Sequence, residues 1–289
     1  MFQKLIVCLL ILVLASSSLF AQTEKIDAEV NAKIRQEATK NSQIMRTIHY
    51  LTDIYSPRMT GTPSLKAAQD WAIKELTGYG LQNAHFENWD FGFAGWQNEK
   101  LSVHSISPFK DSLVAEVMAW TPSTKGVITA ETLNLIPPPN PTDEELNAYF
   151  ATVKNQIKGK IVLTGKHNLN PINFNSPQLR MNDEEAQKTF APENPRPISS
   201  PTPTPTVKRL TALEVNDEVD KFLKTNGALI RVYDAREPHG VIRTIINRTR
   251  DVSQFLPTII LRNEDYGRIT RVLADGIAVK LEIDVQNRL

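Results

Sequence analysis

Residues 256–289 have the sequence LPTIILRNEDYGRITRVLADGIAVKLEIDVQNRL, and this stretch decides the fold. Residues 257–261 are a short apolar run rich in β-branched side chains, which is typical of a buried strand. Residues 265–274 have the apolar spacing of a short amphipathic helix, with Asp265 at the position of a helix N-cap. Residues 278–285 alternate as a strand. The stretch therefore predicts strand, helix and strand, a unit of an α/β fold.

The preceding sequence predicts more elements of both kinds. Helices are predicted where apolar residues recur near a 3.6-residue spacing, and Thr62 followed by Pro63 marks one helix start. Strands are predicted where apolar and polar residues alternate, or where β-branched residues cluster between glycines. The helices are expected at 26–51, 63–77, 143–157 and 210–223, and the strands at 83–91, 100–106, 113–120, 127–136, 159–165, 227–235 and 240–249.

The N-terminus has the pattern of a signal peptide, residues 1–21. Lys4 supplies a positive charge, Leu5–Leu14 is an uncharged apolar run, and Ser16–Ser18 with Ala21 give a small-residue exit. The run is shorter than the roughly 20 residues of a membrane-spanning helix, so we expect cleavage and no stable membrane anchor afterwards. An uncleaved anchor is the alternative. The chain is therefore expected to be exported, to the periplasm or the extracellular space.

The net charge and the cysteine content limit the partners and the chemistry that the sequence predicts. The formal net charge is +1, and loss of Lys4 with the signal peptide leaves a neutral chain, so the charge gives no reason to expect a nucleic-acid partner. Cys8 is the only cysteine and lies within the signal peptide, so we expect no disulfide or thiolate chemistry in the mature chain. The protein must therefore be stabilised by its core, and 289 residues suffice for about two domains.

Residues 168–206 lack periodicity and end in APENPRPISSPTPTPT. This stretch has too little apolar surface to offset the entropy of ordering the chain. We expect a flexible, proline-rich insertion loop. A ligand strand for a proline-binding module is the alternative.

The sequence contains no familiar catalytic motif. It lacks a Gly-x-Ser-x-Gly elbow and a His-Glu-x-x-His helix, and none of its five histidines stands in a His-x-Asp or His-x-x-x-His pattern. His85 and Glu87 would share one face of a strand, but zinc needs three or four ligands, so a surface or half-buried strand pair is expected. We therefore assign no catalytic residue and no metal-binding residue.

The loop YSPRMTGTP, residues 55–63, holds the best candidates for a functional role. The guanidinium of Arg58 can orient a carboxylate or a neighbouring loop, and Gly61 permits a turn. The loop would then form the rim of a substrate site, whereas a structural tether is the alternative. The sequence of residues 247–249, Asn-Arg-Thr, also matches a glycosylation acceptor, although so short a motif is expected by chance.

Several segments resemble a known family. Residues 50–91 resemble the start of mature zinc aminopeptidases and carboxypeptidases of the plasma glutamate carboxypeptidase type, metallopeptidase family twenty-eight. The shared features are a Pro-Arg-x-x-Gly loop, an Ala-x-x-Trp helix, a Gly-Leu-x-Asn turn and a His-x-Glu-x-Trp strand. Residues 159–163 and 257–283 resemble the protease-associated domain inserted in those enzymes. The resemblance covers most of residues 45–165 and 225–289.

This resemblance implies a fold of two parts. Residues 22–120 would be the leading helices and first strands of a mixed-sheet α/β exopeptidase domain, and residues 121–289 a β-rich protease-associated domain. The family holds two zinc ions with ligands that follow this domain, and one Glu acts as general base on a metal-bound water. No position of this sequence matches those residues. The resemblance thus implies no cofactor in this chain, and a peptide substrate only if a catalytic domain is supplied.

Two functions are compatible with the resemblance. The chain is an N-terminal fragment of an exported zinc exopeptidase, inactive alone, or it is a non-catalytic exported protein whose protease-associated domain is a binding module. In either case the leading part would expose a sheet edge and an apolar face, which a homo-oligomer or another covering partner would bury. An unrelated enzyme with its site at Arg58 is a third interpretation.

Overall fold

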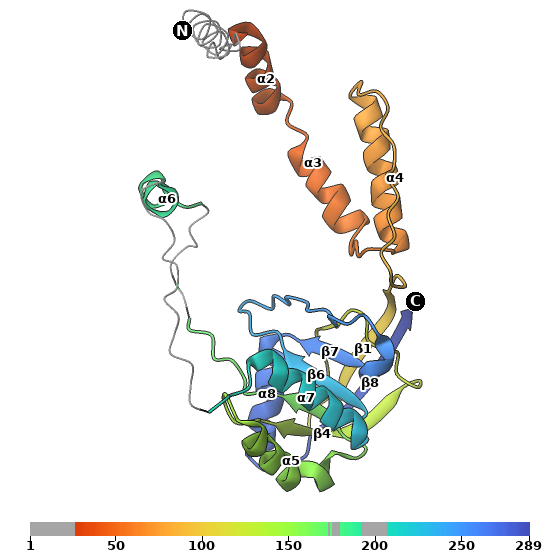
Figure 1. Ribbon diagram of the computed structural model, residues 1–289, viewed down its shortest axis with the longest axis vertical. Helices are drawn as coiled ribbons and strands as arrows, with labels where there is room; N and C mark the ends of the chain where they lie inside the picture. Colours follow the sequence, from red (N-terminus) through yellow and green to blue (C-terminus); the bar gives the residue numbers. More distant parts are fainter. Residues whose placement is uncertain (1–26, 173, 175–179, 192–206) are drawn as a thin grey trace, which may run out of the picture.

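The computed structural model describes residues 27–172, 174, 180–191 and 207–289 (Figure 1). The described chain has a mixed α/β fold, so the predicted fold class is confirmed. The predicted signal peptide and most of the proline-rich end of the insertion lie outside the described residues. Within these ranges, none of the helices is long and apolar enough to cross a membrane.

A mixed sheet is the centre of the fold, with strand order β2-β1-β8-β4-β5-β6-β7-β3. Strands β4 to β7 are parallel neighbours, whereas β8 runs antiparallel to both β4 and β1. The sheet joins strands from both sides of residue 120, where the sequence analysis placed a domain boundary. The strands are β1 (Gln97–Ser107), β2 (Asp111–Ser112), β3 (Ala115–Val117), β4 (Ile128–Leu135), β5 (Ile161–Thr164), β6 (Ile230–Asp234), β7 (Thr258–Leu261) and β8 (Lys280–Arg288).

Helices cover both faces of this sheet. Helices α5 (Asp143–Ile157) and α7 (Ala212–Thr225) pack on one face, and α8 (Asn263–Ala274) packs on the other. In β5, Val162 belongs to the core under α5 and α7, whereas its two sequence neighbours belong to the core under α8. All residues of β5 are buried. A strand buried on both faces needs a continuous apolar run, which explains why β5 shows no alternation.

The starts of the other predicted helices follow from local hydrogen bonds. The side chain of Thr62 accepts the hydrogen bond that caps the following helix. Thr142 and Glu145 form a reciprocal capping box at the start of α5, and Thr211 and Glu214 form another at the start of α7. These polar residues therefore fix where each helix begins.

The predicted N-cap of α8 is wrong. The helix begins at Asn263, after Arg262, and Asp265 lies in its first turn. Asp265 is buried, accepts a hydrogen bond from the backbone nitrogen of Val114 at 3.0 Å and pairs with Arg262 at 2.8 Å. Its carboxylate joins α8 to the start of β3, which is a tertiary contact that local sequence does not reveal.

Two predicted strands, 83–91 and 240–249, are not strands in the structure. The first is extended, but no described segment pairs with it. The second forms an isolated bridge between Ile246 and Ala119. Alternating side chains are compatible with a strand in both segments, but a strand also needs a partner backbone along its length. In the described chain the first segment has no such partner, and the second has one only at this bridge.

The glycosylation motif at residues 247–249 has a structural role. Asn247 is 1% exposed, and its amide donates to the carbonyls of Trp120 at 2.9 Å and Asp251 at 3.2 Å. The side-chain oxygen of Asn247 accepts from the hydroxyl of Thr249 at 2.8 Å. Attachment of a glycan to Asn247 would require this turn to open.

The leading helices form no core of their own. They are α2 (Ala28–Lys40), α3 (Ile44–His49) with the π-helical turn Tyr50–Ile54, and α4 (Pro63–Gly78), and they project away from the sheet (Figure 1). Their apolar side chains are largely exposed, as expected for an apolar face without a partner. The large ones are Val30, Ile34, Ile44, Met45, Ile48, Ile54 and Leu76.

A short helix lies within the predicted insertion loop. Helix α6 (Asp183–Phe190) begins after Asn182, whose side chain accepts a hydrogen bond from the backbone of Glu185. It has no buried residue and lies apart from the sheet (Figure 1). Local capping therefore stabilises a helix in a segment for which the sequence periodicity predicts none.

A glycine pair connects the leading helices to the sheet. Gly61 has φ +78°, a backbone conformation that other residues adopt only with strain. A side chain on Gly95 would collide with the carbonyl of Gly61. The next residue, Trp96, is buried, and its ring nitrogen donates to the carbonyl of Thr121 at 3.0 Å. The loop and the start of the sheet thus approach closely because both positions lack a side chain.

Arg250 holds the end of the extended segment, residues 91–93, against the sheet. Its guanidinium carbon lies 5.3 Å, 5.2 Å and 5.7 Å from the ring centroids of Phe91, Phe93 and Trp120. The Nε atom is buried and has no hydrogen-bond partner in the described chain. The aromatic faces therefore provide the principal attraction for this cation.

Replacing Arg250 with Ala should loosen residues 91–93 without unfolding the sheet. Cation–π contacts contribute about 0.5–1 kcal/mol each at partly exposed sites, so amides of this segment should exchange faster in hydrogen-exchange mass spectrometry. Arg248→Ala, at an exposed neighbour, is the matched control. Unchanged exchange in Arg250→Ala would show that the aromatic contacts do not hold the segment.

A buried ion pair joins α7 to β6. Arg231 is 1% exposed, and its Nη1 lies 2.6 Å from Asp220. Its other nitrogens donate to Thr164 at 3.1 Å and to Asn216 at 2.9 Å. Burial raises the pKa of the Asp220 carboxyl, and the charge of Arg231 opposes that effect. Removing Arg231 would leave a carboxylate with no cation in a buried site.

We expect Arg231→Met to lower the free energy of unfolding by about 3 kcal/mol, because one partner of a buried ion pair is left unpaired. Urea denaturation followed by circular dichroism measures this change. Arg243→Met is the control, since Arg243 is exposed and pairs at the surface with Glu237. Equal urea midpoints for Arg231→Met and the unmodified chain would contradict the view that the ion pair of Arg231 and Asp220 stabilises the fold.

Candidate functional site

The parallel strands place a site at one edge of the sheet. β5 ends at Thr164, β6 at Asp234 and β7 at Leu261, and parallel strands end on the same side. In open α/β sheets, ligands bind in crevices outside these carboxyl ends. A ligand site is therefore expected among the segments that follow the three strands.

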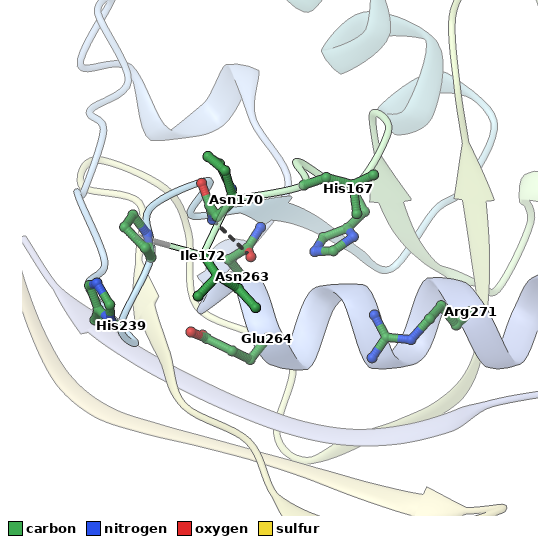
Figure 2. Close-up of a pocket in the computed structure, with 10 residues that line it drawn as sticks. His167, Asn170, Ile172, His239, Asn263, Glu264 and Arg271 are labelled. Atoms are coloured by element: carbon green, nitrogen blue, oxygen red, sulfur yellow. Dashed lines mark hydrogen bonds between the residues drawn. The ribbon is translucent and has the colours of Figure 1, made fainter. Parts of the chain in front are cut away.

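Asp234 organises the polar groups at this edge. Its carboxylate accepts from the backbone nitrogens of Asn168 at 2.8 Å and Arg236 at 2.9 Å. The side-chain amide of Asn263 donates to both carboxylate oxygens at 3.1 Å and to the carbonyl of Asn168 at 2.8 Å. Asn170 donates to Asn263 at 3.0 Å (Figure 2). The network fixes three loops relative to one another.

A cavity of about 370 Å³ lies beside this network (Figure 2). Its walls come from the segment after β5, from the turn at Pro238 and from α8. Apolar residues of the first segment and polar residues of α8 face it together. The lining residues are His167, Leu169, Asn170, Pro171, Ile172, Pro238, His239, Asn263, Glu264 and Arg271.

His167 lies against α8 because one helical residue has no side chain. A Cβ atom on Gly267 would stand 2.5 Å from Nε2 of His167 and 2.9 Å from Nη1 of Arg271. The Nε2 atom is buried and has no hydrogen-bond partner in the described chain. Tyr266 supports the same segment, since its hydroxyl donates to the carbonyl of Gly165 at 2.8 Å. Burial raises the pKa of Tyr266, which keeps this hydroxyl a donor.

Glu264 and Arg271 bring opposite charges to the cavity. Both side chains are exposed, and neither forms an ion pair within the described ranges. One carboxylate oxygen of Glu264 accepts from the backbone nitrogen of Gly240 at 3.1 Å. This hydrogen bond orients the carboxylate and leaves its other oxygen available for a ligand.

A second hollow of about 350 Å³ lies at the same edge of the sheet, lined by residues of α7, β6 and the prolines 137–139. Its main cation, Arg231, is already paired with Asp220 and stacks over the ring of Tyr233 at 4.3 Å. Burial raises the pKa of Tyr233. Two further cations, Lys166 and Arg236, line this hollow from exposed positions.

The predicted loop residues lie elsewhere. Arg58 is exposed and makes no hydrogen bond or ion pair in the described chain. Gly61 lines a small hollow of about 180 Å³ with Trp96 and the last residues of β8. Neither residue lines the carboxyl-edge cavity, so the structure does not bring them together with it. Their proposed role at a substrate rim stays a prediction.

His85 and Glu87 are exposed on the extended segment 83–93. They line a hollow of about 350 Å³ against α4, together with apolar residues of that helix. Nothing in the described chain completes a metal site there.

His167 and Arg271, which line the carboxyl-edge cavity, belong to no motif in the sequence. Their positions after β5 and on the helix after β7 are the signal that would have found them.

The zinc pair implied by the resemblance does not fit the residues described. Across the described ranges, no group of three or more His, Cys, Asp or Glu stands close enough to hold a metal ion. A zinc site needs at least three protein ligands. We therefore derive no zinc chemistry from these side chains.

The described chain is a mixed α/β fold with a cavity at the carboxyl edge of its parallel strands. No known protein-family model matches the sequence, and no curated protein matches it. Among solved structures, a peptidase M28 precursor from Shewanella amazonensis SB2B is similar, with a TM-score of 0.48 and 15% identity over 90% of this chain and 50% of that chain.

Two further solved structures are also similar. The zinc aminopeptidase BSAP from Bacillus subtilis has a TM-score of 0.42 and 13% identity over 84% of this chain and 42% of its own. The aminopeptidase from Aneurinibacillus sp. strain AM-1 has a TM-score of 0.39 and 14% identity over 86% of this chain and 46% of its own. The chain thus spans half or less of the length of each of these three structures.

The contact between His167 and Gly267 can be tested by a double-mutant cycle. Glycine to alanine ordinarily stabilises a helix interior by about 1 kcal/mol, but at Gly267 the new methyl group would displace the His167 ring. Gly267→Ala should therefore change the free energy of unfolding less favourably in the unmodified chain than in the His167→Ala variant. The difference between these two changes, measured by urea denaturation, should be at least about 0.5 kcal/mol. Gly78→Ala, where nothing lies within 4 Å, is the control. Additive effects would contradict this packing.

Proposed function

We propose that this chain supplies a non-catalytic, peptide-contacting part of an exported zinc exopeptidase. The observation that carries the proposal is the carboxyl-edge cavity. It gathers Glu264 and Arg271, which are exposed and form no ion pair in the described ranges, whereas the Asp234 network around it is internally satisfied. Such an arrangement can bind and orient a polar chain.

The groups that line the cavity suit binding. Glu264 and Arg271 lie seven residues apart on α8 and can contact two ends of one ligand. In the described ranges no group of three or more His, Cys, Asp or Glu stands close enough to hold a catalytic metal ion. The described residues therefore support binding better than hydrolysis.

The sequence resemblance supports the wider context. In the family that residues 50–91 and 257–283 resemble, zinc activates a water molecule and polarises the scissile carbonyl. In our proposal residues outside this sequence supply that chemistry. The exposed apolar side chains of α2 to α4 would then pack against the part of the enzyme that carries it. Export to the periplasm or the extracellular space is part of the same proposal.

A free-standing binding module is the second candidate function. Its support is the unequal distribution of buried side chains. The sheet and its covering helices contain the buried clusters, whereas Ala68 is the buried residue of α2 to α4. A sheet domain with its own core can bind a ligand without any catalytic partner.

Zinc content and hydrolysis test the first candidate. We expect the purified chain to contain substoichiometric zinc by atomic emission spectroscopy and to hydrolyse no aminoacyl p-nitroanilide, with or without added zinc. Stoichiometric zinc with hydrolysis that a chelator abolishes would overturn the proposal. Co-expression with a zinc exopeptidase domain that lacks these segments distinguishes the two candidates. A stable complex favours the enzyme part, and a monomer favours the free module.

A further inference from the structure

The cavity on α8 brings together two opposite charges and a histidine. The carboxylate of Glu264 and the guanidinium of Arg271 have no ion pair in the described ranges, and Nε2 of His167 has no hydrogen bond. The amides of Asn170 and Asn263, by contrast, bond to one another and to Asp234. The cavity therefore has a fixed polar wall and two oppositely charged ends.

The two charges are held apart by the helix itself. Glu264 and Arg271 both lie on α8, seven residues apart, and therefore on one side of the helix. At about 1.5 Å per residue their backbones are separated by about 10 Å along the axis. They cannot pair with each other, and Figure 2 shows them at opposite ends of the cavity.

One end of the cavity has the donors that bind a carboxylate. The guanidinium of Arg271 lies over Gly267, on the side of α8 where the ring of His167 packs with its Nε2 atom buried. Arg271 is exposed, and a guanidinium presents several N–H groups. A terminal carboxylate placed at this end would accept hydrogen bonds from Arg271.

The other end has an acceptor that suits an ammonium group. Glu264 is held by the backbone nitrogen of Gly240 at 3.1 Å, which leaves one carboxylate oxygen available. Between the ends, Leu169 and Ile172 are 79% and 80% exposed beside the cavity and offer apolar surface. A ligand with an ammonium end, a carboxylate end and a partly apolar middle matches this wall.

The spacing sets the size of the ligand. An extended peptide advances about 3.3 Å per residue, so the charged ends of a di- or tripeptide are about 6–10 Å apart. Arg271 reaches back toward the start of the helix, over Gly267, which shortens the distance between the two ends of the cavity. Two or three residues therefore fit better than a longer peptide.

We propose that this cavity binds an unblocked di- or tripeptide along α8, with its amino terminus at Glu264 and its carboxylate at Arg271. The choice of a peptide as the ligand class rests on the proposed function, since an exopeptidase receives and releases such molecules. The two-ended recognition rests on the geometry of α8.

Isothermal titration calorimetry of the full chain with trialanine tests the proposal. Trialanine should bind, and N-acetyl-trialanine and trialanine amide should each bind about tenfold or more weakly, because each modification removes one charge-assisted contact. Acetate alone should bind more weakly than trialanine. A peptide blocked at both ends that binds as tightly as trialanine would overturn the proposal, and so would acetate of equal affinity.

Substitution of each charged residue shows which end of the peptide that residue binds. Glu264→Gln should weaken trialanine about tenfold and remove the difference between trialanine and its N-acetyl form. Arg271→Gln should likewise weaken trialanine about tenfold, and it should remove the difference between trialanine and trialanine amide. Asp275→Asn and Lys280→Gln, exposed charges outside the cavity, are matched controls and should change nothing. Equal losses in the controls would contradict the site, as would no binding by a chain that circular dichroism shows to be folded.

The result of the trialanine titration can be distinguished from the result of the zinc assay. Peptide binding requires neither zinc nor turnover in this proposal. Hydrolysis by the purified chain would overturn the proposed function and leave two-ended binding in place. An inactive, zinc-free chain that binds no trialanine would overturn the peptide site and leave the proposed function in place.

Discussion

The parallel pairing of β5, β6 and β7 is the constraint on which the rest of the structure depends. Main-chain hydrogen bonds align Thr164 with Tyr233, and Asp234 with Leu261, so the three strands end together. The segments that follow are distant in sequence, yet they meet at one edge. Asp234 can then accept hydrogen bonds from Asn168 and Asn263 only because this alignment places them there.

Helix α8 adds the second constraint. Its buried face, with Tyr266 and Ile269, packs on the sheet and fixes the direction of the helix. The opposite face then presents Glu264 and Arg271 to the cavity, and Gly267 between them leaves room for His167. The same residues that stabilise the fold therefore set the separation of the charged groups. Binding chemistry at this edge is a consequence of how the helix packs.

The sequence predicts those elements whose signals are local. Thr62 marks a helix start through a hydrogen bond within one turn, and β5 follows from an apolar run between two glycines. Segments 83–91 and 240–249 were misassigned because a strand also requires a partner backbone, which a single segment does not encode. Asp265 was misassigned for a similar reason, since its bond to Val114 spans distant parts of the chain.

The candidate site was the least predictable feature. His167 and Arg271 are more than one hundred residues apart and acquire a shared role only when β5 and β7 align, whereas Arg58 stood out in the sequence but lies outside the cavity. The most direct measurement is a ¹⁵N heteronuclear correlation spectrum of the chain during titration with trialanine. Our account predicts that the shifting amides cluster at His167, Gly240 and the first two turns of α8. Shifts confined to α2–α4 and segment 83–93 would contradict it.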